Sequence, residues 1–408
     1  MKLRTYCIVC LFCAAAGITV SAQVLITLHN FCSQTDCTDG TNPYGTLLKA
    51  TDGNLYGTTE AGGPGGYGTV FKVTPSGTLT TLHTFVYTDG AEPYAGLVQG
   101  TDGNFYGTTY TGGAHSYGTV YRMTASGTVT TLYSFCSQYW CADGARPVAP
   151  LVQASDGNFY GTTVTGGAHE YYGTVFKITP SGTLTTLYSF CSETNCTDGA
   201  WPYGGLIQAS SGMLYGTTLR FGVNGDNGTV YKMDPTAPPG EGMSVLHYFS
   251  GTDGAYPYGG LVQGTDGNFY GTTYYGGVDN GNSGTVFKIT PSGVTTTLYI
   301  FCSLILNGPP CGDHPYAGLL LGTDGNFYGT TWFGGTNGGS DGTVFKITAS
   351  GTLTWLHSFA GTDGQYPAGG LVQGADGNLY GTTTVGGADQ FGTVFRLGPL
   401  HRCLTCGQ

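Results

Sequence analysis

Short runs of apolar and β-branched residues, separated by turn residues, recur along the chain about every 50 residues. Four segments make up one unit: Gly-Leu-Val-Gln, Phe/Leu-Tyr-Gly-Thr-Thr, Gly-Thr-Val-Phe/Tyr-Lys/Arg and Thr-Leu-Tyr/His-x-Phe. Their richness in Val, Thr, Phe, Tyr and Leu is typical of β-strands. After the N-terminal segment, the sequence shows no 3.6-residue periodicity of an amphipathic helix. The pattern therefore predicts an all-β protein.

The polar residues between these segments predict tight turns. Thr-Asp-Gly-Asn, first found at residues 51–54, joins the first and second strands and tolerates the positive φ of two-residue hairpins. Thr-Pro-Ser-Gly, at residues 74–77, joins the third and fourth strands with Pro and Gly at favoured turn positions. Each unit is therefore expected to form four antiparallel strands.

The unit occurs seven times, and its circular order predicts the fold. The last copy stops after its third strand, at residues 392–397, whereas residues 24–31 supply an isolated fourth strand at the other end of the chain. Pairing the two ends would close a ring and cover an exposed sheet edge. We therefore predict a seven-bladed β-propeller over residues 23–398, closed by three strands plus one.

The repeated unit resembles the Gloeo/Verruco (GloVer) tandem repeat of exported bacterial proteins. The resemblance rests on Gly-Leu-Val-Gln-Gly-Thr-Asp-Gly-Asn-Phe-Tyr-Gly-Thr-Thr at residues 96–109 and its six counterparts. It implies a secreted or surface protein of unassigned activity, often with a C-terminal sorting anchor, and it supplies no catalytic positions. Because the tail, residues 399–408, has no hydrophobic stretch, we expect free secretion.

Residues 1–22 have the layout of a secretory signal peptide. Lys2 and Arg4 precede an apolar stretch, and Val20-Ser21-Ala22 is a small-residue cleavage site. The stretch is shorter than the roughly 20 apolar residues of a membrane span. We expect an exported protein, secreted or at the cell surface, with no membrane span after cleavage.

The cysteines predict local disulfides. Three of the 13 lie in the predicted signal peptide, and the others form close pairs. The pairs are Cys32/Cys37, Cys136/Cys141, Cys191/Cys196, Cys302/Cys311 and Cys403/Cys406. Close pairs in an exported protein are typical of disulfides. Cys403 and Cys406 could instead be half of a metal site, but no second half with matching spacing exists, so we expect no metal and no cofactor.

Composition and charge exclude several classes of protein. Only 9% of the residues are charged and 73 of 408 are Gly, which differs from an ordinary cytosolic enzyme. The glycines lack a collagen period, and 13% aromatic residues argue against disorder. A net charge of −11 argues against nucleic acid or an anionic membrane as a partner.

Comparison of the copies separates scaffold from candidate chemistry, because a residue type present in nearly every copy is expected to be structural. This applies to the Asp of the hairpin turn and the Asp of the inter-blade loop, for which calcium binding is the alternative to backbone capping. It applies also to seven third-strand cations, expected to pair with the repeated Asp residues, and to a fourth-strand position shared by His and Tyr. The cations are Lys72, Arg122, Lys177, Lys232, Lys288, Lys346 and Arg396.

The long, variable loops between the second and third strands and between blades share one face, where binding is expected. Irregular aromatic residues make Trp140, Trp201, Tyr275 and Trp332 candidate ligand contacts, and His169 with Glu170 forms a conceivable acid/base pair. We favour a monomeric, non-catalytic binding or adhesion module for a glycan or protein. One alternative is a polysaccharide hydrolase or lyase using loop carboxylates, and a second is a structural envelope protein.

Overall fold

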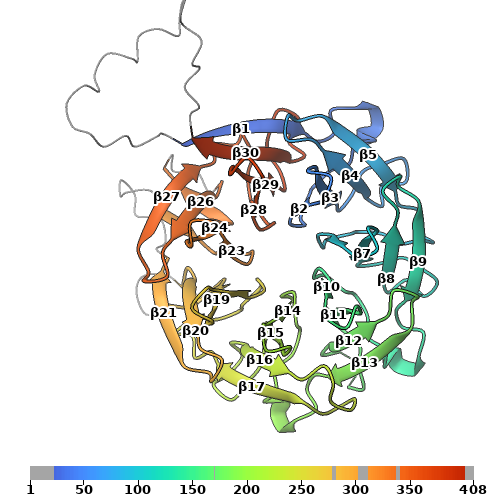
Figure 1. Ribbon diagram of the computed structural model, residues 1–408, viewed down its shortest axis with the longest axis vertical. Coiled ribbons are helices and arrows are strands. Elements are labelled where there is room, and N and C mark those ends of the chain that lie inside the picture. The colour runs from blue at the N-terminus through green and yellow to red at the C-terminus, as the bar shows by residue number, and fades with distance from the viewer. Residues whose placement is uncertain (1–22, 170, 278–281, 302–310, 337–340, 400–408) are drawn as a thin grey trace, which may run out of the picture.

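Seven four-stranded antiparallel sheets are arranged as blades around a central axis (Figure 1). The computed structural model describes residues 23–169, 171–277, 282–301, 311–336 and 341–399. Each blade runs from a two-residue inner strand to a longer outer strand. The predicted all-β, seven-bladed propeller is therefore confirmed.

The strands follow the predicted segments closely. The first three blades contain β2 (Leu48–Lys49), β3 (Leu55–Thr59), β4 (Thr69–Val73) and β5 (Leu79–Thr84); β6 (Val98–Gln99), β7 (Phe105–Thr109), β8 (Thr119–Met123) and β9 (Val129–Ser134); and β10 (Val152–Gln153), β11 (Phe159–Thr163), β12 (Thr174–Ile178) and β13 (Leu184–Ser189). Blades four and five contain β14 (Ile207–Gln208), β15 (Leu214–Thr218), β16 (Thr229–Met233) and β17 (Met243–Tyr248); and β18 (Val262–Gln263), β19 (Phe269–Thr273), β20 (Thr285–Ile289) and β21 (Thr295–Ile300).

Blade six adds a small ladder to the repeated plan, and blade seven joins the two ends of the chain. Blade six contains β23 (Leu320–Leu321), β24 (Phe327–Thr331), β26 (Thr343–Ile347) and β27 (Leu353–Ser358), beside the two-stranded pair β22 (Cys311–Asp313) and β25 (Phe333–Gly335). Blade seven contains β28 (Val372–Gln373), β29 (Leu379–Thr383), β30 (Thr393–Pro399) and β1 (Gln23–Asn30). Helical structure in the described residues is limited to the 3-10 turns η1 (Thr35–Cys37), η2 (Tyr139–Cys141) and η3 (Thr194–Cys196).

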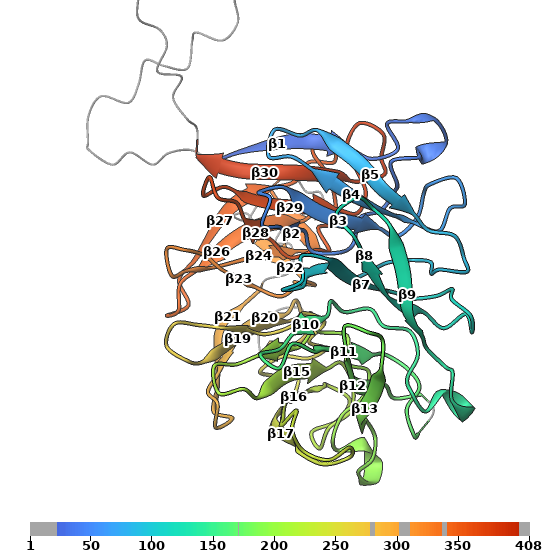
Figure 2. The ribbon, with the colours of Figure 1, turned by 45° about the vertical axis from the view of Figure 1, so that its right-hand side comes forward.

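The ring closes where β1 pairs antiparallel with β30, from Gln23 opposite Pro399 to Asn30 opposite Thr393. Figures 1 and 2 both show these strands side by side at the outer edge of blade seven. Leu25 of β1 packs against the apolar cluster between blades six and seven, and Leu28 packs against the cluster between blades seven and one. The N-terminal strand thus takes part in both interfaces of its blade. Residues 1–22 and 400–408, which include the predicted signal peptide and the Cys403/Cys406 pair, lie outside the described residues.

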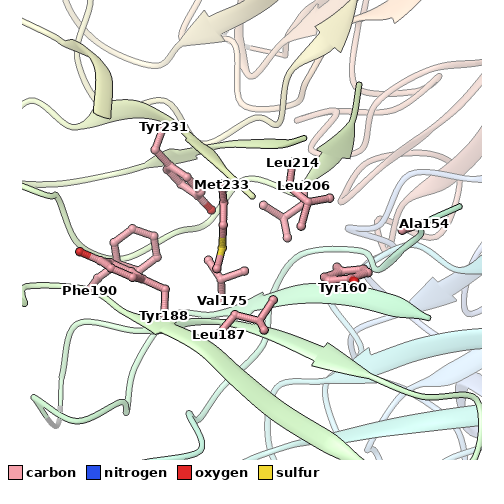
Figure 3. Close-up of a cluster of buried hydrophobic side chains, with 10 residues drawn as sticks. All are labelled: Ala154, Tyr160, Val175, Leu187, Tyr188, Phe190, Leu206, Leu214, Tyr231 and Met233. Carbon is pink, nitrogen blue, oxygen red and sulfur yellow. The ribbon is translucent and has the colours of Figure 1, made fainter. Parts of the chain in front are cut away.

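The core consists of apolar clusters between neighbouring blades. Figure 3 shows one in which Tyr160 and Val175 of blade three meet Tyr231 and Met233 of blade four. In the second strand of each blade, Gly leaves room for the aromatic ring opposite it in the third strand: a Cβ on Gly161 would lie 2.6 Å from a ring carbon of Phe176. Burial of both sheet faces explains the low content of charged residues.

The repeated polar residues connect loops to strands, as expected from their regularity. In the hairpin turn, Asp156 accepts hydrogen bonds from Asn158 N (3.0 Å), Asn158 Nδ2 (2.7 Å) and Tyr160 Oη (2.8 Å), and it pairs with Lys177 Nζ at 3.3 Å. These hydrogen bonds and the Lys177 ammonium oppose the desolvation of the Asp156 carboxyl and lower its pKa to about 2. Across the inter-blade loops, the fourth-strand His or Tyr bonds the repeated Asp, as in His29–Asp39 (2.9 Å) and Tyr188–Asp198 (2.9 Å).

Three of the predicted disulfides lie in inter-blade loops, where each closes a loop that contains a 3-10 turn. They are Cys32–Cys37, Cys136–Cys141 and Cys191–Cys196. Cys311 is also disulfide-bonded, while Cys302, Cys403 and Cys406 lie outside the described residues.

Replacing Leu25 with Asp should lower the free energy of unfolding by about 2 kcal/mol or more, because a charge would replace an apolar side chain packed at the closing strand. The neighbouring Ile26→Asp is the matched control, since Ile26 is 42% exposed and lies opposite Arg396. Urea unfolding would compare the two variants. Equal losses would contradict the role assigned to β1.

Replacing Asp156 with Asn should make stability less sensitive to acid. The folded-state pKa of about 2 lies below the ordinary value of 3.8, so Asp156 stabilises the fold above about pH 4 and this contribution is lost as the pH falls toward 2. The unfolding midpoint measured from pH 5 to pH 2 should therefore fall less steeply in Asp156→Asn. Ser211→Asn, at the equivalent turn of blade four, removes no titratable group and should leave the slope unchanged.

Candidate functional site

A cavity of about 520 Å³ lies at the central axis, lined by residues of all seven blades. Its wall combines small Gly and Ala residues, from the segments that precede the inner strands, with half-buried tyrosines. Five tyrosines occupy the same place in their repeats, directly after a proline: Tyr44, Tyr94, Tyr203, Tyr258 and Tyr316. Val148 and Ala368 stand at this position in the other two blades, so one side of the wall is less aromatic.

These tyrosines support one another and remain neutral. Tyr44 meets Tyr94 edge-on at 5.3 Å, and Tyr258 stacks on Tyr316 at 4.7 Å between ring centres. Burial raises the pKa of each of the five phenols above its ordinary value of 10.0. Their hydroxyls are therefore protonated at neutral pH and can donate or accept hydrogen bonds beside apolar ring faces.

The residue before each of these prolines forms a second ring, which we call the pre-proline ring. Its members all have left-handed backbone with φ between 55° and 59°. They are Asn42, Glu92, Arg146, Trp201, Tyr256, His314 and Tyr366. Such φ values are uncommon for residues other than Gly and concentrate at functional sites.

Backbone hydrogen bonds hold the pre-proline ring in place. Trp201 N donates to the carbonyl of Tyr172 in the preceding blade (2.9 Å), and Trp201 O accepts from Leu219 N in its own blade (2.9 Å). The same two bonds recur at all seven positions. The fold thus fixes the backbone at these positions, while the side chain changes from blade to blade.

Three of the predicted contact residues, Trp201, Tyr275 and Trp332, lie together beside the cavity tyrosines and the pre-proline ring, and we call this surface the mouth of the cavity. Trp332 stacks on Tyr366 with ring centres 5.6 Å apart and lies 5.2 Å from Tyr316. Tyr275 contacts His314 at 5.0 Å and Tyr256 at 5.5 Å. Trp201 joins the same surface through Arg220, whose guanidinium lies over both Trp201 (5.7 Å) and Tyr256 (4.3 Å).

The other predicted contact residues lie elsewhere or outside the described residues. Trp140 is in η2, is 59% exposed and packs against Tyr139 at 5.2 Å. His169 is exposed and borders a separate groove of about 600 Å³ along β13. Glu170 is not among the described residues, so the His169–Glu170 pair stays a sequence-based prediction.

Charge at the mouth is divided between neighbouring blades. Glu60 and Glu92 lie near Tyr94, whose hydroxyl donates to Glu60 Oε1 at 2.6 Å. Burial, together with the negative charge of Glu92, raises the pKa of Glu60 above 4.5 despite this hydrogen bond. Arg146 and Arg220 follow on the next two blades. Within the described residues, no group of three or more His, Cys, Asp and Glu side chains is placed to hold a metal ion.

The importance of the pre-proline ring was missed in the sequence. One indication was present, since this position varies between copies while the following Pro is constant. The sequence shows variable loops, but it does not show that this one position has the same backbone conformation in every blade. The left-handed φ, which separates these residues from ordinary loop residues, follows from hydrogen bonds between blades and is visible only in the folded ring.

The model of the Gloeobacter/Verrucomicrobia repeat family matches residues 16–141, 136–309 and 302–406. The chain belongs to this family. The predicted relationship is therefore confirmed, and the family's repeats cover the whole ring. No curated protein sequence matches the chain.

Solved structures with similar folds include three bacterial propellers of low sequence identity. One is the extracellular domain of a provisionally assigned hybrid two-component system of B. thetaiotaomicron (10% identity, TM-score 0.57, covering 91% of this chain and 39% of that one). Another is PorZ, a surface component of the type-IX secretion system of Porphyromonas gingivalis (15% identity, TM-score 0.55, covering 88% of this chain and 47% of that one). The third is a provisionally assigned 6-phosphogluconolactonase of Bacteroides fragilis (18% identity, TM-score 0.52, covering 82% of this chain and 89% of that one).

These likenesses concern the fold of this repeat protein. The chain spans less than half the length of the first two structures. Within the described residues, helices with the length and hydropathy needed to cross a membrane are absent.

Replacing Glu92 with Gly should give a more stable protein than replacing it with Ala, by about 1 kcal/mol, because only Gly adopts the left-handed backbone without steric cost. Glu60 provides the matched comparison, since its φ is not positive. There the order should reverse, with Ala more stable than Gly. Urea unfolding of the four variants measures both differences, and the same order at both sites would contradict backbone strain in the ring.

Proposed function

We propose that this protein is an exported, non-catalytic binding module whose ligand is a glycan held at the aromatic mouth of the central cavity. The observation that carries the proposal is the continuous set of aromatic side chains around this mouth. It runs from Trp201 through Arg220 and Tyr256 to Tyr275, continues through His314 and Phe333 to Trp332, and reaches Tyr44 and Tyr94.

The chemistry of these side chains suits a sugar. A pyranose ring has apolar C–H faces and polar hydroxyl edges, and half-buried tyrosines offer ring faces beside hydroxyl groups. Contacts between the rings, such as Trp332 on Tyr366, order the side chains before a ligand binds. Pre-ordered side chains lose less entropy on binding, which favours affinity.

The size of the site favours a glycan over a folded protein. A cavity of about 520 Å³ lies in the usual range of small-ligand sites, about 300–1,000 Å³. A stable protein partner commonly needs about 800 Å² of surface on each side. Export is supported by the disulfides in the inter-blade loops, which are typical of proteins in oxidising compartments.

Glycan cleavage is a second candidate function, favoured by one observation. Glu60 is a half-buried acid beside Glu92, and its raised pKa is the property of a general acid in glycoside hydrolysis. Release of reducing ends from a bound glycan, lost in Glu60→Gln and in Glu92→Gln, would favour this function over simple binding. Glycan binding without release of reducing ends would favour the non-catalytic binding module.

Replacing Trp332 with Ala should weaken glycan binding about tenfold or more, because it removes the aromatic face shared by Tyr366, Tyr316 and Tyr44. Trp140→Ala removes an exposed indole outside the mouth and should leave binding unchanged. A glycan array identifies ligands of the purified protein, and calorimetry gives their affinities. Trp332→Phe keeps an aromatic ring and should lose less affinity, which separates ligand contact from a folding defect.

Absence of binding to every glycan on the array would overturn the proposed function. Equal losses in Trp332→Ala and Trp140→Ala, with unchanged melting temperatures, would instead move the binding site away from the mouth.

A further inference from the structure

The cations of the propeller divide into scaffold residues and two exceptions at the mouth. Seven of the ten Lys and Arg side chains in the described residues follow Phe or Tyr in the third strand of a blade, and Lys49 lies in β2. The two that remain are Arg146 and Arg220. Neither residue occupies the repeated third-strand position, and both guanidinium groups lie over aromatic rings of the mouth.

Arg220 already has an anionic partner. Its Nη1 pairs with Asp226 Oδ2 and lies 3.0 Å from Tyr256 Oη. Its charge is therefore neutralised within its own blade. This ion pair explains how the mouth tolerates one guanidinium among aromatic rings.

Arg146 has no such partner among the described residues. Its guanidinium lies 5.4 Å from the ring centre of Tyr110 and 5.9 Å from that of Tyr117, with one weak hydrogen bond of 3.4 Å from Nη1 to Tyr110 Oη. No carboxylate of the described residues is within ion-pairing distance. A guanidinium has five N–H donors in a planar fork, so most of its bonding capacity is unused.

The surroundings of Arg146 place its charge beside the cavity. Tyr110 lines the cavity and lies 5.4 Å from Tyr94. Burial raises the pKa of Tyr203 in the same wall, while the charge of Arg146 acts in the opposite direction, so its field reaches the cavity. Stacking on two rings and a fixed left-handed backbone orient the fork before any ligand arrives.

We propose that Arg146 binds the carboxylate of an acidic sugar, a hexuronate unit of a glycan seated in the aromatic mouth. The inference rests on the proposed function and names the ligand class of that site. The guanidinium fork matches a carboxylate with two parallel hydrogen bonds, and Tyr94, Tyr110 and Tyr203 surround the sugar ring. One guanidinium without an ionic partner among the described residues suits a singly charged carboxylate better than a doubly charged phosphate.

Calorimetry with a panel of uronate glycans tests this assignment. The panel contains oligomers of polygalacturonate, alginate, hyaluronan and glucuronoxylan, each with its carboxyl-reduced form, and polyglutamate as an acidic peptide. At least one uronate glycan should bind with an affinity about ten times that of its carboxyl-reduced form, or higher. Arg146→Asn should abolish that difference.

Asn is the suitable replacement because it tolerates a left-handed backbone and occupies the equivalent position, Asn42, in blade one. Lys232→Gln, in the third strand of blade four, makes the same change in net charge and should leave the preference intact. Arg146→Lys keeps the charge without the fork and should retain part of the preference. Melting temperatures report whether each variant is folded.

Failure of this inference differs from failure of the proposed function. Equal binding of acidic and carboxyl-reduced glycans, still sensitive to Trp332→Ala, would keep the glycan site and overturn the role of Arg146. Binding of polyglutamate in place of the uronate glycans would assign Arg146 to acidic peptides and overturn the proposal. Absence of binding to the whole panel and to the wider glycan array would overturn both.

Discussion

Closure of the ring by β1 and β30 is the interaction on which the rest of the structure depends. Without it, blade seven would present the unpaired edge of β30, and the clusters on both of its faces would lose Leu25 and Leu28. A closed ring gives every blade two neighbours, so each inter-blade cluster supports the next. The central cavity is lined by residues of all seven blades, so closure of the ring also encloses the cavity.

Rigidity is transmitted to the mouth by polar contacts between strands and loops. The His/Tyr–Asp hydrogen bonds fix the inter-blade loops, and isolated bridges such as Ala200 with Arg220 join these loops to the second-to-third-strand loops. The pre-proline residues lie between the two sets of loops. Their side chains therefore vary on a backbone that the neighbouring blade holds in place, which suits selective binding more than large conformational change.

Comparison of the seven copies identifies the scaffold residues, but it identifies only some of the residues at the mouth. The turn Asp and the third-strand cation are expected to be structural because they recur, and they form ion pairs in blades three and six, Lys177 with Asp156 and Lys346 with Asp324. Trp201, Tyr275 and Trp332, expected as contacts because they are irregular aromatics, meet at the mouth, whereas Trp140, expected on the same ground, lies exposed in η2. Irregularity indicates that a residue is free to vary, but not where the ring places it.

Local composition and the order of the copies specify the strands, their turns, the number of blades and the way the ends meet. The folded ring specifies which variable side chains come together at the mouth. Glu60, Glu92, Arg146 and Arg220 come from different repeats, and their grouping depends on blade packing and on hydrogen bonds from one blade to the next. Those contacts join residues far apart in the chain, and no local pattern encodes them.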